Sequence, residues 1–351
     1  MGRKLLWASL ALAPITILLR YVFDVGDTAL FVFAAAALVP LAWLIGEATE
    51  HAGEHTGPGI GGFLNASFGN APELIIALFA VNATLPNVVR GSLAGSVVSN
   101  ILLVLGVALI FGGEGRDGKP LDRFSILLQL GLVLGAVLLF LVPSVPSWTG
   151  DAERHSLAVI SIPVAIVLLL VYTTTTVRGL RRHKRLHEES GDTPAEGWSL
   201  PVALVVLAAA TVVTALISET LVHSLDSFAA AAGLSEFFIA AVIVAIVGNA
   251  AEHGGAIVIA SRGKLPLATE IAVSSSAQVA LFVTPAVALL SWAVTPALPL
   301  SFRPIELAAM GGSALLVGIV LSDGRGRRWE GFFLVALYVG VVLAFLVAGD
   351  R

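Results

Sequence analysis

The chain has 351 residues, of which 57% are hydrophobic and 13% are charged, and its formal net charge is −4; the mean hydropathy is +0.94. Soluble proteins are about half apolar and about a quarter charged, so this composition excludes an ordinary soluble enzyme and a disordered chain. The absence of cysteine excludes disulfides and thiolate sites, and the lack of a basic surplus gives no reason to expect nucleic-acid binding. The composition therefore predicts an all-α polytopic membrane protein that acts within or across the lipid bilayer.

Eleven apolar segments are candidates for membrane-spanning helices, each of which needs roughly 20 mostly apolar residues. In chain order they are 5–23, 28–50, 68–84, 92–111, 124–142, 156–177, 200–222, 236–260, 267–292, 304–321 and 330–348. The first segment imitates a secretory signal, but Pro14 and the apolar run to Phe23 predict a retained helix. The longest hydrophilic stretch, 178–198, separates the chain into two halves.

The basic residues predict the orientation of these spans. With a cytoplasmic N-terminus, most of the 20 lysines and arginines fall in cytoplasmic segments, as the positive-inside rule expects. Eleven spans then place the C-terminus outside, and we expect a prokaryotic plasma membrane as the host.

The chain matches itself without gaps at an offset of 179 residues. The matching pairs are Gly69-Asn70-Ala71-Pro72-Glu73 with Gly248-Asn249-Ala250-Ala251-Glu252, Ser96 with Ser275, and Ser99 with Gln278. Because the third and eighth spans run in opposite directions, the match predicts an inverted repeat. The expected organisation is a leading helix (1–27), a first five-helix repeat (28–177), a cytoplasmic linker (178–198) and a second five-helix repeat (199–351).

Both matching motifs are suited to an interrupted helix. Gly69 and Gly248 are flexible, Asn70 and Asn249 can cap a helix, and Pro72 suits a first helical turn. Transporters built from inverted repeats bind their substrate near the middle of the membrane, often on such interrupted helices. We therefore expect unwound backbone at these motifs, with its carbonyl groups lining a cavity.

Each motif also carries a carboxylate, Glu73 or Glu252, inside an apolar span. A charge there costs at least about 2–3 kcal/mol and marks an ion or proton route. Burial and mutual repulsion favour the protonated forms when the site is empty, whereas a divalent cation favours the ionised forms. Cation and protons would then compete for one site, and such competition is the basis of antiport.

The side chains expected around these carboxylates offer oxygen ligands. They are Asn70, Asn249, Ser96, Ser275 and Gln278. Calcium takes about 6–8 oxygens in flexible geometry, whereas magnesium prefers a strict octahedron, and zinc or copper would favour nitrogen or sulfur. The sequence therefore predicts a calcium site formed by these residues with Glu73 and Glu252.

Four further polar residues are assigned to a proton or ion pathway: Ser99, His253, Glu50 and Glu219. His253 follows Glu252, and its alternative role is to support a ligand. Glu50 and Glu219 lie near the ends of the second and seventh spans, where they would form vestibules on opposite faces. The alternative is that these helix ends already lie in headgroup water, where a carboxylate costs little.

The two motifs resemble the signatures of the calcium/proton exchangers, a family of the cation/calcium exchanger superfamily. Residues 69–75 are similar to G-N-x-x-E-L-I and residues 248–257 to G-N-A-A-E-H-x-x-A-I, and the resemblance extends from Pro40 to Met310. It implies an eleven-span secondary transporter, not an enzyme, in which Glu73 and Glu252 alternate between calcium and protons. The supporting residues that it implies are Asn70, Asn249, Ser96, Ser275, Gln278 and His253. Calcium would be the transported substrate, with no cofactor, and a homo-oligomer is compatible with the sequence.

The central linker departs from the family pattern. Related proteins often carry a clearly acidic helix there, whereas here a basic run, 181–185, precedes only scattered acidic residues. Regulation by calcium through this segment is therefore not expected.

Three other functions stay open at this stage. A sodium-coupled calcium exchanger is the nearest, although Asn70 and Asn249 stand where that relative typically has a hydroxyl residue. A passive channel is less favoured, because conduction requires weak, multiple sites. His51, Glu54 and His55 match the H-x-x-E-H pattern of inverted zinc peptidases, but the match has no repeat counterpart, and we expect residues 57–59 (Gly-Pro-Gly) to end its helix.

Overall fold

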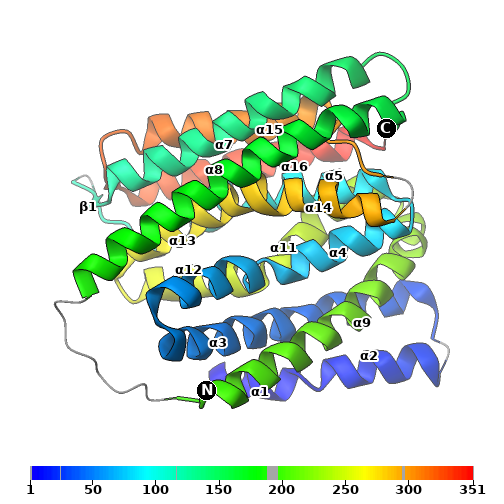
Figure 1. The fold of residues 1–351 in the computed structure, drawn as a ribbon, viewed down its shortest axis with the longest axis horizontal. Coiled ribbons are helices and arrows are strands. Elements are labelled where there is room, and N and C mark those ends of the chain that lie inside the picture. The colour runs from blue at the N-terminus through cyan, green and yellow to red at the C-terminus, as the bar shows by residue number, and fades with distance from the viewer. Residues whose placement is uncertain (1, 24, 116, 188–196, 295–296, 351) are drawn as a thin grey trace.

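The computed structural model describes residues 2–23, 25–115, 117–187, 197–294 and 297–350, and almost all of them are helical (Figure 1). Among the described residues, eight helices are long and apolar enough to cross a membrane, and a bent pair of helices forms a ninth candidate. Two further apolar helices, at residues 71–82 and 304–320, are shorter. The protein is therefore an α-helical integral membrane protein, and the predicted spans 68–84 and 304–321 correspond to these two shorter helices.

Most of the long apolar helices among the described residues lie in the first half of the chain, where the helical structure is interrupted at residues 69–70. Its elements are α1 (Gly2–Ser9), α2 (Leu12–Tyr21), α3 (Asp27–Phe68), α4 (Ala71–Asn82), α5 (Pro86–Val98), the π-helical turn η1 (Ser99–Val104), α6 (Leu105–Gly112), β1 (Lys119–Pro120), α7 (Arg123–Ser144), the 3-10 turn η2 (Val145–Ser147) and α8 (His155–His187).

The second half has the same kinds of element in a similar order. They are α9 (Leu200–Ala232), α10 (Glu236–Phe238), the π-helical turn η3 (Ile239–Val244), α11 (Ala245–Gly248), α12 (Ala250–Ser261), α13 (Leu265–Gln278), the π-helical turn η4 (Val279–Val283), α14 (Thr284–Leu290), the 3-10 turn η5 (Ser291–Ala293), α15 (Pro304–Val320), β2 (Arg325–Gly326) and α16 (Arg328–Ala348).

Several helix ends follow directly from local sequence. Proline lies in the first turn of α4, α5, α13 and α15, where its missing N–H has no helical partner to lose. Glu306 and Glu330 form capping boxes at the starts of α15 and α16. Gly233, with a φ of 67°, ends α9, because glycine adopts this left-handed conformation without steric cost.

The internal repeat is visible in the backbone. α4 and α12 begin and end at residues that correspond under the 179-residue offset. The residues before them, Asn70 and Asn249, have φ/ψ values of −98°/14° and −92°/11°. In addition, the π-helical turns η1 and η4 follow α5 and α13 and end at corresponding residues, Val104 and Val283. Such turns in long helices often mark functional sites.

The expectation that residues 57–59 end their helix is wrong, because the helical structure of α3 continues through them to Phe68. A proline inside a helix removes one backbone hydrogen bond and bends the helix, but the remaining hydrogen bonds can continue the pattern. The far end of α3 is also held by packing, because Phe68 contacts a small apolar cluster that includes Ile45 and Leu207. The part of α3 that is long and apolar enough to cross a membrane ends at Thr56.

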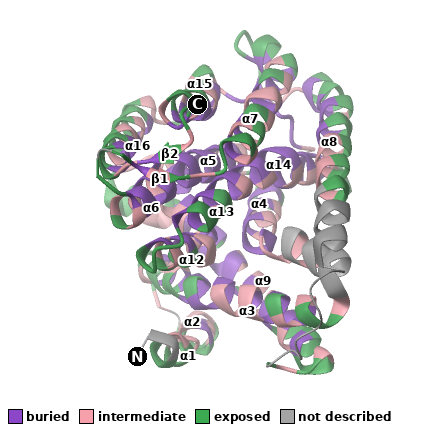
Figure 2. Cartoon of the chain, turned by 90° about the vertical axis from the view of Figure 1, so that its left-hand side faces the viewer, coloured by how far each residue is buried: buried purple, intermediate pink, exposed green. Residues whose placement is uncertain are grey.

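Helices α5, α13 and the turns that follow them lie at the centre of the molecule, surrounded by the other helices (Figure 2). On one side α2 and α3 pack against α9, where Phe31 stacks on Phe228 with 4.3 Å between ring centroids. Arg20 of α2 donates to Glu219 at 3.1 Å and to Thr220 at 2.8 Å on α9. The arginine inside the predicted first span is thus neutralised by an acidic residue of the seventh.

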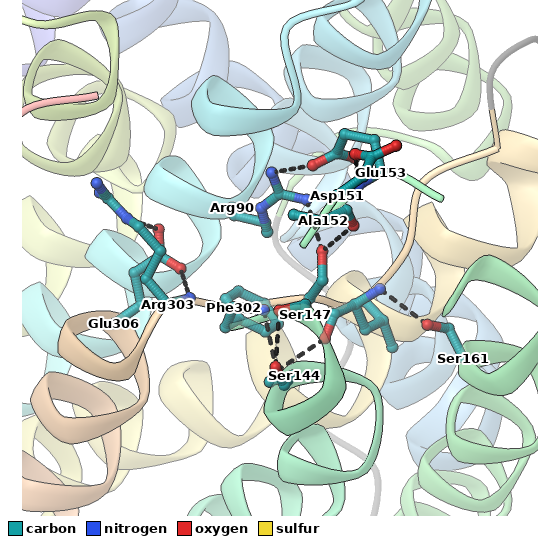
Figure 3. A network of polar contacts seen from close by, with 12 residues as sticks. Arg90, Ser144, Ser147, Asp151, Ala152, Glu153, Ser161, Phe302, Arg303 and Glu306 are labelled. Atoms are coloured by element: carbon teal, nitrogen blue, oxygen red, sulfur yellow. Dashed lines mark hydrogen bonds and ion pairs between the residues drawn. The ribbon is translucent and has the colours of Figure 1, made fainter. Parts of the chain in front are cut away.

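The two ends of the molecule are closed differently. At one end the antiparallel pair β1–β2 joins two loops, and Lys119 donates to the backbone carbonyl of Gly263. At the other end, buried Arg90 donates to Glu153 at 2.6 Å and to Ser301 at 3.1 Å (Figure 3). Helix α7, which is 22 residues long, separates these ends.

Candidate functional site

Two interrupted helices meet in the interior of the protein. The first interruption lies between α3 and α4 at residues 69–70, and the second lies at Asn249 between α11 and α12, where the chain bends by 59°. From these breaks α4 and α12 extend toward opposite ends of the molecule (Figure 1). Glu73 and Glu252 each lie in the first turn of their helix, where the helix dipole favours a negative charge.

Glu73 is enclosed. Its side chain is buried, and its Oε2 atom has no hydrogen-bond partner among the described residues. It borders a cavity of about 10 Å³ together with Ser92, Ser96 and Gly248, a volume close to the minimum that holds one water molecule. Gly248, four residues before Glu252, also borders this small cavity, so the two motifs adjoin each other there.

Glu252, in contrast, borders a cavity of about 650 Å³. Other polar residues around this cavity are Glu47, Thr49, Glu50, Ser274, Ser275 and Gln278. Ser275 donates a hydrogen bond from its hydroxyl group to Oε2 of Glu252. The two carboxylates are therefore inequivalent in this conformation: Glu252 borders the large cavity and Glu73 only the small one.

The two signature asparagines bind residues of the opposite repeat. Nδ2 of Asn70 donates to Oε1 of Gln278 at 2.7 Å, and Nδ2 of Asn249 donates to Oγ of Ser96 at 2.8 Å. Both lie at the N-cap position of their helix, but neither makes a side-chain capping hydrogen bond. The two asparagines thus stand at the helix starts, as expected, but the expectation of side-chain capping is wrong, and their amide groups point to the opposite repeat instead.

The glycines contribute space at the interruption. Gly69 borders the cavity beside Glu252, and Gly248 lies against Glu73. Neither is among the described residues with positive φ, so the helix breaks do not depend on a left-handed glycine. Pro72 lies in the first turn of α4, as its residue type suggested.

Asn100 belongs to this polar cluster, although the sequence comparison did not identify it. Its side chain contacts Ser275, Asn249 and His253, all in the second repeat. The self-match missed it because the residue at the corresponding position is Val279. Its position one helical turn after Ser96 and directly before the apolar run 101–105 is the sequence signal that could have identified it.

The four residues assigned to a proton or ion pathway do not lie in one place. Glu50 borders the large cavity, and His253 is buried against Asn100. Ser99 is buried and donates to the backbone carbonyl of Ser96 at 3.2 Å. Glu219 forms an ion pair with Arg20 at 3.1 Å; in the described part of the chain, neither Ser99 nor Glu219 borders the two cavities at the carboxylates.

The H-x-x-E-H match does not form a zinc site. His51 contacts Glu54 at 3.2 Å, whereas Nε2 of His55 is 2.7 Å from the backbone carbonyl of Trp198. Across the described ranges, no three histidine, cysteine, aspartate or glutamate residues form a group that could hold a metal ion. The peptidase interpretation is therefore not favoured.

Comparison with known proteins gives a consistent result. The family described as sodium/calcium exchanger protein matches residues 27–178 and 202–347. The Ca2+/H+ antiporter ChaA of Bacillus subtilis (strain 168) is 39% identical over 325 residues, covering 91% of this chain and 92% of the relative. A Ca2+/H+ antiporter of Aphanothece halophytica is 35% identical over 336 residues, covering 91% and 90%.

Solved structures share the fold. The structure of native YfkE has a TM-score of 0.83 and 35% identity, covering 97% of this chain and 99% of the other. The H+/Ca2+ exchanger CAX has a TM-score of 0.73 at 17% identity, covering 99% and 92%, and this likeness concerns the fold alone. The chain therefore belongs to the sodium/calcium exchanger protein family and, within it, to the calcium/proton exchangers.

Proposed function

We infer that this protein is a secondary active antiporter that exchanges calcium for protons by alternating access. The observation that carries this inference is the position of two carboxylates, Glu73 and Glu252, in the first turns of two oppositely directed helices, with Gly248 of the second motif lying against Glu73 of the first. Relatives that are 39% and 35% identical over most of their length are named Ca2+/H+ antiporters, which supports the same pair of substrates here.

The chemistry of the exchange follows from the burial of these groups. Two carboxylates that repel each other inside a protein favour protonation when no cation is present. A calcium ion would replace the protons, because its double charge stabilises both ionised carboxylates. Binding of calcium and binding of protons are then alternatives at one site, and each completed cycle couples the two fluxes.

We assign the calcium ligands to Glu73 and Glu252, with further oxygens from Asn70, Asn249, Ser96, Ser275 and Gln278. In this conformation several of these side chains are hydrogen-bonded to one another across the repeats. A cation that needs about 6–8 oxygens must therefore turn them toward itself. His253 is assigned a supporting or proton-handling role. Gly69 and Gly248 are assigned the role of leaving space at the helix breaks, and Pro72 that of starting α4.

The difference between the two carboxylates supports alternating access. Glu252 borders the large cavity, whose wall includes Glu47 and Glu50, and Glu50 would serve as the vestibule residue on that side. Helix α1 and Trp198 also lie near this wall, since Trp7 contacts both Trp43 and Trp198. Because the basic residues Arg3 and Lys4 stand just before Trp7 in the sequence, we place the cavity on the cytoplasmic side.

We further propose the complete topology. Eleven spans result if α4 and α15 each count as one crossing and the bent pair at residues 236–261 counts as one. The leading helix (1–27) then precedes two inverted repeats, 28–177 and 199–351, joined by the linker 178–198, of which 188–196 lie outside the described residues. The N-terminus would be cytoplasmic and the C-terminus external, in a prokaryotic plasma membrane.

The test is calcium uptake into proteoliposomes under separately imposed gradients. An outward-directed proton gradient should drive saturable uptake of radiolabelled calcium, and a proton ionophore should abolish it. A sodium gradient at constant pH should drive none. Uptake driven by sodium alone would identify a sodium-coupled exchanger, and non-saturating flux that ignores both gradients would identify a channel.

A further inference from the structure

A single amide, that of Asn100, connects the two repeats at the candidate site. Asn100 lies in the π-helical turn η1 of the first repeat and is 1% exposed. Its Nδ2 atom donates to Oγ of Ser275 at 2.8 Å and to Oδ1 of Asn249 at 3.4 Å. Its Oδ1 atom is 2.9 Å from Nε2 of His253. Both polar atoms of this amide are therefore hydrogen-bonded to residues of the second repeat.

A backbone carbonyl fixes the direction of these hydrogen bonds. Nδ2 of Asn249 lies 2.8 Å from the carbonyl oxygen of Ala245, which can only accept. Oδ1 of Asn249 is therefore an acceptor, and Nδ2 of Asn100 must point toward it. Oδ1 of Asn100 is then left to accept, so His253 donates to it from Nε2.

The same reasoning fixes the hydroxyl group of Ser275. Because Asn100 donates to Oγ of Ser275, one lone pair of this oxygen is occupied. The hydroxyl hydrogen is then directed to Oε2 of Glu252. Asn100 does not contact either carboxylate in these hydrogen bonds, but it determines how one of the assigned calcium ligands faces its carboxylate.

The arrangement is not reproduced in the other half of the site. The residue that corresponds to Asn100 is Val279, which is buried in η4 and has no polar side-chain atom to offer. The equivalent serine of the first repeat, Ser96, accepts instead from Asn249. The two serine ligands therefore accept hydrogen bonds from different residues, Ser275 from Asn100 and Ser96 from Asn249.

We propose that Asn100 is a positioning residue for cation binding, which orients Ser275 and Asn249 around Glu252 across the repeat interface. This proposal rests on the calcium/proton exchange inferred above. Partners that orient metal ligands typically contribute about 10–100-fold to affinity. Removing the amide should therefore weaken calcium binding while the reorientation of the carrier is largely retained.

The first variant is Asn100→Val, which installs the side chain found at the corresponding position of the second repeat. In proton-driven uptake, we expect the calcium KM to rise about tenfold and the maximal rate to change by less than about threefold. The matched control is Ser276→Ala. Ser276 is buried beside Ser275, but its hydroxyl donates only to backbone carbonyls, at 3.1 and 3.4 Å, so the KM should stay unchanged.

A double-mutant cycle then separates positioning from general structural support. If Asn100 acts through Ser275, then Asn100→Val should raise the KM far less in a Ser275→Ala background than in the wild type. Equal effects in both backgrounds would overturn the proposal, as would an unchanged KM in Asn100→Val. Asn100→Ser, which replaces the amide with a hydroxyl group that can still donate and accept a hydrogen bond, should give an intermediate KM. It also provides a smaller, polar replacement if the valine variant does not fold.

The wild-type protein distinguishes the two levels of inference. If wild-type proteoliposomes show no proton-driven calcium uptake, the exchange function itself fails. If the wild type transports calcium and the Asn100 variants keep its KM, only the positioning role fails.

Discussion

A side-chain carbon placed on Gly248 would lie 3.4 Å from Cγ and 3.7 Å from Oε1 of Glu73. The glycine of the second signature thus forms the wall against the carboxylate of the first. The two motifs, which are 179 residues apart, are parts of one site because the second helix break packs against the carboxylate that follows the first.

The first prediction concerns this contact. Gly248→Ala should fold normally, because 3.4 Å is an ordinary van der Waals distance, but its methyl group would occupy space beside a cavity of only about 10 Å³. We expect a several-fold rise in the calcium KM in proteoliposome uptake. Gly254→Ala is the control, since a methyl group there meets no atom within 4 Å. The same calcium KM in both variants would show that the added methyl group does not restrict Glu73.

The second prediction concerns the carboxylates. Glu73→Gln and Glu252→Gln should each abolish proton-coupled uptake, because an amide cannot exchange a proton for a cation. Neither change should lower the melting temperature in detergent, since an uncharged amide of similar shape replaces a carboxyl group that is costly to bury. Glu270→Gln, on the exposed face of α13, serves as the control for uptake. Retained coupled transport in both site variants would overturn their assignment.

The third prediction uses the absence of cysteine from the chain. A cysteine in place of Ser274, which borders the large cavity, should react with a membrane-impermeant maleimide. One in place of Ser92, which borders only the small cavity at Glu73, should react much more slowly. Labelling in oriented vesicles, read as a gel shift, also tests the side: we expect reaction from the cytoplasmic face. Faster labelling at position 92 would contradict the described accessibility.

The fourth prediction concerns the ion pair at the end opposite β1–β2. Arg90 is 1% exposed, and its partner Glu153 is 36% exposed. Glu153→Gln removes one of two acidic neighbours of this buried cation, the other being Glu306, and should lower the free energy of unfolding by about 1–3 kcal/mol. A thermal melt in detergent measures the loss. Glu114→Gln, at an exposed side chain, should leave the melting curve unchanged. The same melting temperature in both variants would show that Ser301 and Glu306 are sufficient partners for Arg90.

Several features of the fold follow from local chemistry. The apolar segments and the prolines at helix starts define where most helices lie, because backbone groups in lipid must be satisfied within each helix. The repeated G-N-x-x-E motif located both interruptions, and α4 and α12 correspond residue by residue. Local chemistry also misled at two places. The Gly-Pro-Gly segment does not end α3, and the signature asparagines, although they stand at N-cap positions, make no side-chain capping hydrogen bond. Contacts with residues far away in the sequence outweigh these local preferences.

Other relationships depend on which helices lie together. Nothing in the sequence near Arg20 specifies Glu219 as its partner, because that pairing requires α2 to lie against α9. Asn100 has no repeat counterpart, so symmetry could not identify it, and its contacts appear only when η1 meets α12 and α13.

The sequence by itself determined a helical membrane protein with a duplicated acidic motif, because hydrophobicity and residue identity along one chain are enough to specify these. Only the tertiary structure decided that Glu252 borders a large cavity while Glu73 is enclosed, and which amide faces which serine. Those properties arise from the packing of side chains contributed by distant segments, and a one-dimensional pattern does not contain that geometry.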